Sequence, residues 1–302
     1  MDNSTSIIIP SFNGETRILK TLNALESQAN YISEIIVVID GSTDNTINVL
    51  TSLNFKKPEV KFIEQENAGR AKTRNSGAEI AKGDVLIFLD DDMIAEPDLV
   101  QKHQLFHQIN ENSLCGGNQL ENPAWAKTDF DRYRCELRKN WNSHFTQLTE
   151  LKQENIHLTA ANFSITKKNF FKIGGFEESL TDAEDIHLAF KAMDNNMRVF
   201  FDPEIIGWHN DFINLKEYII RKREYVASHR KLRKMGVSNS WIKKRELKLN
   251  NIKSPIFSFF GKNHWIRFTE SSLFRSLPDV FKYKIYDLTI TSLGSLYTGR
   301  EL

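Results

Sequence analysis

The stretch VLIFLDDDMIAEPDL, residues 85–99, sets five apolar residues directly before three consecutive carboxylates. The run VLIFL is typical of a strand that is buried on both faces of a sheet. Asp90, Asp91 and Asp92 then bring three like charges together, and like charges repel one another. A helix cap or a turn can use only one or two of these side chains. The stretch therefore predicts a strand end at which a cation relieves the repulsion.

The residues on either side of this stretch alternate between strand-like and helix-like patterns. Short apolar segments rich in β-branched residues precede it, namely SIIIPSF, EIIVVIDGS and VKFIEQE. Helix-like segments lie between and after them, at residues 15–28, 43–53, 69–81 and 97–111. Regular alternation with short links predicts an α/β fold, with a mostly parallel sheet flanked by helices.

The second half of the chain is less regular. SLCGGNQLE is typical of a further strand, HLTAANFSITKKNFFKIGGF of a strand followed by a turn, and VFFDPEIIGWH of a segment that closes the sheet. Residues 122–155 are expected to be a helical insertion, and a helix is expected from about residue 181 to 195. These patterns predict one α/β domain over residues 1–210 and a mainly helical region over residues 211–302.

Composition separates the same two parts. Residues 1–209 carry 21 Lys and Arg against 31 Asp and Glu, whereas residues 210–302 carry 19 against 8. Such an asymmetry indicates that the two parts face different partners. The only cysteines, Cys115 and Cys135, form no disulfide framework. Because the chain has no signal-like N-terminus and its uncharged stretch at 288–299 is too short to span a bilayer, we expect a cytoplasmic protein.

The three carboxylates favour a divalent cation. Along a strand, positions 90 and 92 point the same way and position 91 points the opposite way. We therefore expect Asp90 and Asp92 to face one site, with Asp91 in contact with a neighbouring group. Oxygen ligands suit Mg²⁺ or Mn²⁺. The sequence has neither a Cys/His cluster with zinc-like spacing nor a Walker P-loop.

Further charged groups are expected at the same edge of the sheet, where the carboxyl ends of parallel strands meet. Asp40 follows EIIVVI, and the pair Glu184–Asp185 opens the later helix. An acidic cleft alone would repel a phosphate group. A bound cation, together with the basic side chains of NAGRAKTRNSG at residues 67–77, would make the cleft attractive to one.

Four segments together carry a family resemblance: SIIIPSFNGE, EIIVVIDGSTDNT, ENAGRAKTRNSGAEIAKGDVLIFLDDD and IGGFEESLTDAEDIHLAF. In this order they resemble the family 2 glycosyltransferases over roughly residues 4–209. The resemblance implies the GT-A fold, which is Rossmann-like, and makes residues 1–210 the catalytic domain. It also implies inverting transfer of a sugar from a nucleotide-sugar donor, with a UDP-sugar as the expected donor, to a saccharide or lipid-linked acceptor in polysaccharide or glycoconjugate biosynthesis.

The resemblance also implies roles for individual residues. Asp185 matches the catalytic base and Glu184 its neighbour in the pair. Mn²⁺ or Mg²⁺ would be held by Asp92, Asp90 and His209, which include the DXD-type motif. The residues implied in nucleotide binding are Pro10, Phe12, Glu15, Asp40, Asn67, Arg74, Asp90 and Asp91.

Some features depart from the family pattern or leave alternatives open. Lys191 stands where the pattern has arginine, and His187 replaces a more usual acid. The alternative functions are those of a nucleotidyltransferase and of a non-catalytic nucleotide-sugar-binding subunit. The basic C-terminal helices would pack on the catalytic domain or on a second copy, or would dock on anionic lipid at the inner face of the membrane. No nucleic-acid-binding module accompanies their charge, so nucleic acid is not an expected partner.

Overall fold

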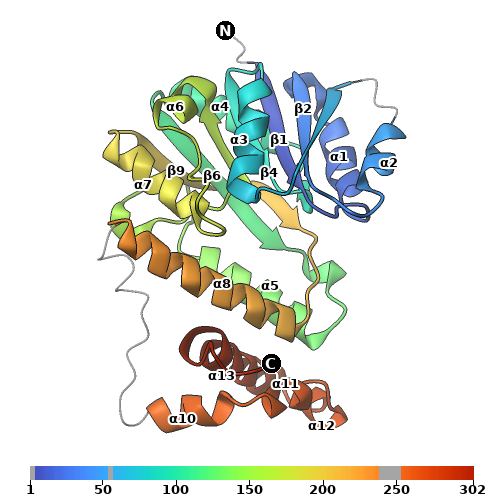
Figure 1. Ribbon diagram of the computed structural model, residues 1–302, viewed down its shortest axis with the longest axis vertical. Helices are drawn as coiled ribbons and strands as arrows, with labels where there is room; N and C mark the ends of the chain where they lie inside the picture. The colour runs from blue at the N-terminus through green and yellow to red at the C-terminus, as the bar shows by residue number, and fades with distance from the viewer. Residues whose placement is uncertain (1–3, 54–56, 238–252) are drawn as a thin grey trace. The chain divides into compact units, whose positions relative to one another are not determined.

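A computed structural model describes residues 4–53, 57–237 and 253–302 (Figure 1). The chain forms two compact units. The first contains the residues up to Glu121 together with Trp141–Asn210, and the second contains Asn122–Asn140 together with Asp211–Leu302. The predicted insertion at 122–155 is thus divided between the units.

The first unit is built on a mixed sheet in the order β3-β2-β1-β4-β8-β6-β9-β5, with β7 paired to β9. Strands β1 to β4 are parallel where they pair with one another, as is the β6–β9 pair, and the other pairs are antiparallel. The strands are β1 Thr5–Ser11, β2 Glu34–Asp40, β3 Glu59–Gln65, β4 Val85–Leu89, β5 Met93–Ala95, β6 Ser113–Glu121, β7 Thr149–Leu151, β8 Asn162–Thr166 and β9 Arg198–His209.

Helices cover both faces of this sheet (Figure 1). They are α1 Ile18–Glu26, α2 Thr46–Thr51, α3 Arg70–Ile80, α4 Leu99–Ile109, α6 Lys167–Lys172 and α7 Glu184–Asp194, with short 3-10 turns η1 Ala29–Tyr31 and η3 Gln153–Asn155. Helix α3 packs on β1 and β2, α4 on β4, β8 and β9, and α7 on β6 and β9. Every residue of β2 and β4 is buried, which explains their continuous apolar sequences. The predicted α/β class and flanking helices are confirmed.

Three local expectations were wrong. Strand β4 ends at Leu89, so the three aspartates occupy a turn before β5 and do not alternate along a strand. The segment predicted as a strand and a turn also contains a helix, α6, which Thr166 caps by accepting a hydrogen bond from the Asn169 N–H. Within the predicted helical insertion, β7 forms a strand because it adds to the edge of β9.

The second unit is helical in the part that the structure describes. Its helices are α8 Leu215–Lys234, α10 Lys253–Phe260, α11 His264–Phe268, α12 Ser272–Arg275 and α13 Asp279–Thr291, followed by a π-helical turn, η4 Ser292–Leu296. It also contains the 3-10 turn η2 Pro123–Trp125 and most of α5 Asp129–Asn142. Residues 238–252 of the predicted helical region lie outside the described residues.

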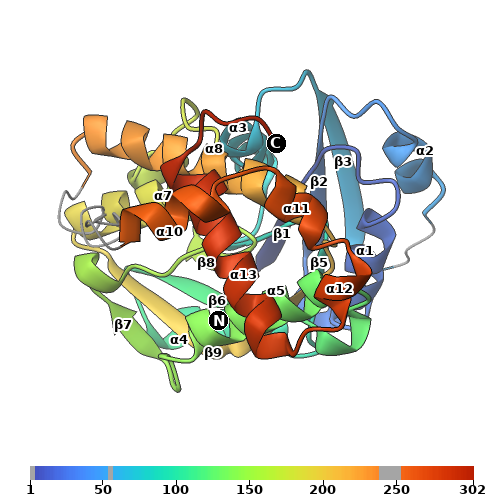
Figure 2. The ribbon, with the colours of Figure 1, turned by 90° about the horizontal axis from the view of Figure 1, so that it is seen from below.

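An apolar core of its own holds the second unit together. Phe130 and Tyr133 of α5 pack with Ile219 of α8 and with Tyr286 and Ile290 of α13. This packing is the reason that residues 122–140 belong to the second unit. Helix α13 also packs against α8 and α10, as can be followed in Figure 2. Among the described residues, no helix is long and apolar enough to cross a membrane.

Candidate active site

The turn after β4 gives each of its three aspartates different surroundings. Asp90 accepts a hydrogen bond from Arg74 at 2.7 Å. Asp91 is buried, and its Oδ2 accepts hydrogen bonds from the Ser11 hydroxyl at 2.7 Å and from Arg17 at 3.1 Å. Burial and the adjacent charge of Asp92 raise the pKa of Asp91 to about 6, although Arg17 acts in the opposite direction. Guanidinium groups of the protein therefore contact two of the three carboxylates and reduce the repulsion among them.

Asp92 faces a histidine at the end of the neighbouring strand β9. Strand β5 runs antiparallel to β9, with Met93 opposite His209, and the backbone N–H of Asn210 donates to the Asp92 carbonyl oxygen at 2.8 Å. Asp92 Oδ1 lies 3.4 Å from His209 Nε2, and both side chains are only slightly exposed. A carboxylate oxygen and an imidazole nitrogen that converge in this way fit a divalent metal ion.

A single buried arginine joins the turn after β4 to the start of α7. Arg74 of α3 is 2 % exposed, and its two terminal nitrogens lie 2.6 Å from Glu184 Oε1 and 2.7 Å from Asp90 Oδ1. Burial opposes the charge of the guanidinium, but Asp90 and Glu184 outweigh it and keep the pKa of Arg74 above its ordinary value. Arg74 was predicted to bind nucleotide, whereas here both of its terminal nitrogens contact protein carboxylates.

Asp185 follows Glu184 in the first turn of α7. Its Oδ2 accepts a hydrogen bond from the Ala160 N–H at 3.2 Å, and its Oδ1 accepts one from the Ile186 N–H at 2.7 Å. The side chain keeps some exposed surface, yet burial is the largest of the causes that raise its pKa, followed by the charge of Glu184. A carboxylate with a raised pKa is a stronger base than an ordinary one.

The backbone before this pair is strained. Ala183 has φ of 62° and is buried. Few residues other than glycine and asparagine adopt this left-handed conformation, and it costs of order 1–3 kcal/mol. Such strain is typical of segments whose position is fixed by their surroundings at functional sites.

The predicted nucleotide residues on β1 and β2 form a second group. The carboxylate of Asp40 is buried and accepts hydrogen bonds from the Ala68 N–H at 2.8 Å and the Gly69 N–H at 3.0 Å, while Asn67 Nδ2 donates to the Asp40 carbonyl oxygen. Glu15 accepts a hydrogen bond from the Asn45 N–H at 3.1 Å. These contacts fix the loops at the ends of β1 to β3.

Two predicted residues of this group keep accessible surface. Pro10 is half-buried in β1, and the aromatic ring of Phe12, just beyond the strand, is about half exposed. Among the residues predicted to bind nucleotide, Phe12 therefore offers the largest apolar surface.

Sequence reasoning did not identify Arg17 and Ser11, which hold Asp91, nor the partners of Lys191. Lys191 donates to the carbonyl oxygens of Gly174 and Gly175 at 3.0 and 2.7 Å. The departure from arginine at position 191 thus concerns a contact with a glycine turn. Nothing in the sequence links these pairs, because each is separated by many residues.

Comparison with known protein families identifies the family of this chain. Residues 6–174 match the model of a protein family described as glycosyl transferase family 2. The chain belongs to glycosyl transferase family 2. The matched region includes Arg74 and the three aspartates, and it ends before Glu184, Asp185 and His209. The predicted family and enzyme class are thus confirmed.

Curated relatives of this family 2 glycosyltransferase match only part of it. An uncharacterized glycosyltransferase of Bacillus subtilis, YfnE, is 40 % identical over 113 residues, which cover 37 % of this chain and 29 % of the relative. Another, from Haemophilus influenzae, is 29 % identical over 196 residues, which cover 62 % of this chain and 61 % of the relative. The chain thus spans less than two thirds of the length of either relative.

Solved structures share its fold along almost the whole chain. Residues 1–349 of S. aureus TarS in complex with UDP have a TM-score of 0.57 at 18 % identity, over 98 % of this chain and 92 % of that TarS fragment. The mannosyltransferase PcManGT from Pyrobaculum calidifontis, in complex with GDP-Man and Mn²⁺, has a TM-score of 0.56 at 16 % identity, over 99 % of this chain and 76 % of PcManGT. The predicted GT-A fold is therefore confirmed.

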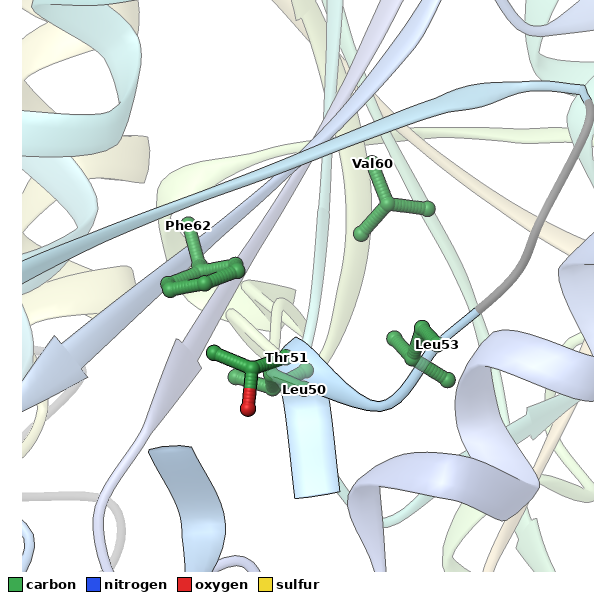
Figure 3. Close-up of a pocket in the computed structure, with 5 residues that line it drawn as sticks. All are labelled: Leu50, Thr51, Leu53, Val60 and Phe62. Atoms are coloured by element: carbon green, nitrogen blue, oxygen red, sulfur yellow. The ribbon is translucent and has the colours of Figure 1, made fainter. Parts of the chain in front are cut away.

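An apolar pocket of the family 2 glycosyltransferase lies outside this site. It is lined by Leu50, Thr51, Leu53, Val60 and Phe62, from α2, the residues after it, and β3 (Figure 3). None of these residues was predicted to bind or react, and none offers a charged group. The pocket therefore has no part in the candidate chemistry.

Proposed function

We propose that this glycosyltransferase moves a sugar from a nucleotide-sugar donor to a hydroxyl group of a saccharide or lipid-linked acceptor, with inversion at the anomeric carbon. The observation that carries the proposal is the ion pair of Arg74 with both Asp90 and Glu184. This contact places the aspartate turn next to the pair that contains Asp185. A site for the donor diphosphate and a base for the acceptor hydroxyl thereby lie side by side.

The nucleotide would bind at the ends of β1 and β2. The exposed ring of Phe12 suits stacking against a base, since a stacked aromatic pair is worth about 0.5–1.5 kcal/mol beyond its buried area. Pro10, Glu15, Asp40 and Asn67 would shape this pocket through the loop contacts described above. TarS was solved with UDP and PcManGT with GDP-Man, so these structures do not distinguish between the two nucleotides. The preference for UDP therefore rests on the resemblance around Asp40.

Asp92 and His209 are the side chains that would hold Mn²⁺ or Mg²⁺. Asp90 fits this role less well than predicted, because its Oδ1 is engaged by Arg74. The imidazole nitrogen favours Mn²⁺ over Mg²⁺, which prefers oxygen ligands. When bound, such an ion would offset the charge that develops on the leaving diphosphate.

Asp185 would act as the base. Its pKa, raised by burial and by Glu184, suits removal of the proton from the acceptor hydroxyl, whose oxygen then forms the new bond to the anomeric carbon as the bond to the diphosphate breaks. Glu184 cannot replace it without giving up its contact with Arg74. A single base with direct attack from the opposite face gives inversion.

Asp185→Asn tests this assignment. We expect transfer to fall by about 10²–10⁴-fold while nucleotide affinity is kept, because a positioned base contributes that much to the rate. Asp194→Asn, at the exposed end of the same helix, is the matched control and should keep full activity. Donor consumption and nucleotide binding would be measured for both variants. An Asp185→Asn enzyme with wild-type turnover would exclude this base.

We also propose that the second unit makes peripheral contact with the inner face of the membrane, where polysaccharide or glycoconjugate precursors are assembled. Residues 210–302 carry the excess of basic residues. Around α12 and the start of α13, Leu273, Val280 and Phe281 are 64 %, 77 % and 61 % exposed, beside the exposed Arg275. Exposed apolar side chains in a region with an excess of basic residues suit anionic lipid.

Vesicle flotation tests the membrane contact. The full chain should float with vesicles of phosphatidylglycerol and phosphatidylcholine, and not with phosphatidylcholine alone. The double variant Val280→Ser/Phe281→Ser should lose this binding, whereas the control Ile109→Ser, at another exposed apolar position, should keep it. Absence of wild-type binding to both vesicles would leave packing or self-association as the role of these helices.

A further inference from the structure

An exposed tryptophan in the first unit is held in place by a group of aromatic rings. Trp141 at the end of α5 is 42 % exposed, and its ring centroid lies 4.3 Å from that of His157. His157 in turn lies 4.6 Å from Phe201 and 5.0 Å from Phe145. The buried His157 supports the tryptophan ring from within the fold, and the buried Phe201 packs against His157 in turn.

The backbone beside Trp141 is also fixed. The next residue, Asn142, is buried, and its Nδ2 donates to Asn118 Oδ1 at 2.6 Å and to the Gln119 carbonyl oxygen at 3.1 Å, both on β6. An aromatic side chain supported in this way loses little conformational entropy when a ligand binds. The exposed part of Trp141 is therefore a preorganised contact surface.

This surface is connected to the candidate base through one short segment. His157 supports Trp141, and Ala160, three residues later, donates its N–H to Asp185 Oδ2 at 3.2 Å. Ile156, Leu158 and Ala160 are buried, so the segment between them is packed in the fold. Three residues span at most about 11 Å. The aromatic group therefore lies close to the place where an acceptor hydroxyl would meet the base.

We propose that Trp141 forms a saccharide-binding subsite for the acceptor. The inference rests on the proposed function. It adds that the part of the acceptor beyond the reacting hydroxyl is a saccharide. The face of an aromatic ring is negative and attracts the slightly positive C–H groups on the apolar face of a sugar ring. The residues that follow Trp141 include the exposed polar Ser143, His144, Thr146 and Gln147, which suit sugar hydroxyl groups better than a lipid chain.

The first test measures binding of the full chain to an array of immobilised oligosaccharides. Wild-type protein should bind a subset of them, and Trp141→Ala should reduce that binding at least tenfold. Trp141→Phe should restore part of it, because it keeps an aromatic face. Phe171→Ala is the matched control, since Phe171 is an aromatic residue of the same unit with 44 % exposure, and it should bind as the wild type does.

The second test separates this subsite from the proposed function. Hydrolysis of UDP-sugars in the absence of an acceptor should be the same in Trp141→Ala and wild type, whereas the KM for any bound oligosaccharide as acceptor should rise. The subsite would be overturned if Trp141→Ala bound glycans as tightly as the wild type does. It would also be overturned if the wild type hydrolysed a donor but bound no glycan. Glycan binding without hydrolysis of any donor would instead contradict the proposed function. If light scattering shows that the wild type is a dimer and that Trp141→Ala is a monomer, Trp141 contacts a second copy of the chain and the subsite is overturned.

Discussion

Replacement of Arg74 by methionine should strongly destabilise the first unit. The substitution keeps most of the apolar volume and removes the cation that Glu184 and Asp90 share. The Glu184 side chain is 5 % exposed, so its charge would be left buried without its partner, and breaking a buried pair in this way costs about 3–5 kcal/mol. The Asp90 side chain is 32 % exposed, and screening by water makes its share the smaller one.

The matched control for this experiment is Arg198→Met. Arg198 donates to Glu150 through Nε and Nη2 at 3.0 and 2.6 Å, but both of these side chains are about half exposed. Loss of such an exposed pair costs about 0–1 kcal/mol. Urea unfolding followed by circular dichroism would give both free energies of unfolding. Equal losses in the two variants, or a loss below 1 kcal/mol for Arg74→Met, would refute the reasoning about burial.

The remaining predictions concern the carboxylates. Because burial and Glu184 raise the pKa of Asp185, kcat/KM for the acceptor should increase with pH to a midpoint well above the ordinary aspartate value of about 4; a midpoint near pH 4 would contradict this. Asp92→Asn should weaken Mn²⁺ binding at least tenfold in an electron paramagnetic resonance titration, and the exposed Asp98→Asn should not. Folding raises the pKa of Asp91 to about 6, so the protonated carboxyl group favours the folded state. This contribution to stability is complete below the unfolded pKa of about 4 and is lost as pH rises through 6. In metal-free buffer the free energy of unfolding of the wild type should therefore fall relative to Asp91→Asn by about 2 kcal/mol between pH 4 and 7, and parallel curves would exclude this effect.

The sequence was sufficient to predict the parallel part of the sheet, β1 to β4, because strands buried on both faces have continuous apolar sequences. The segments around Ile7, Val37 and Ile87 show this pattern, and all three residues are fully buried. Their short links and intervening helices leave few topologies other than a parallel α/β arrangement. The carboxylates at the strand ends could be placed for the same reason.

Contacts between residues far apart in the chain could not be predicted in this way. The sequence suggested that a metal ion relieves the repulsion among the three aspartates, yet Asp91 meets Arg17, which is 74 residues away, and Arg74 meets Glu184, which is 110 residues away. Periodicity carries no information about such pairs. The ion pairs of Arg74 within the protein could therefore not be predicted, and its contact with nucleotide stays a prediction.

The division of residues 122–155 between the two units could not be predicted for a related reason. Helix α5 has apolar residues that suit packing on either unit, and only the partners of Phe130 and Tyr133 show that its first part belongs with α8 and α13. Asn142, at its end, is instead bound to β6. Local pattern predicted the helix, and tertiary contacts decided which core each part joins.

The pairing of Asp90 and Asp91 with arginines has an electrostatic consequence for the donor. Each of these two carboxylates contacts a guanidinium group, although Arg74 is shared with Glu184, so the negative charge that a divalent ion must balance near Asp92 is smaller than the three aspartates alone would give. An ion of charge two would then balance most of the remaining negative charge. That balance would let a diphosphate approach an edge of the sheet whose amino-acid composition alone would repel it.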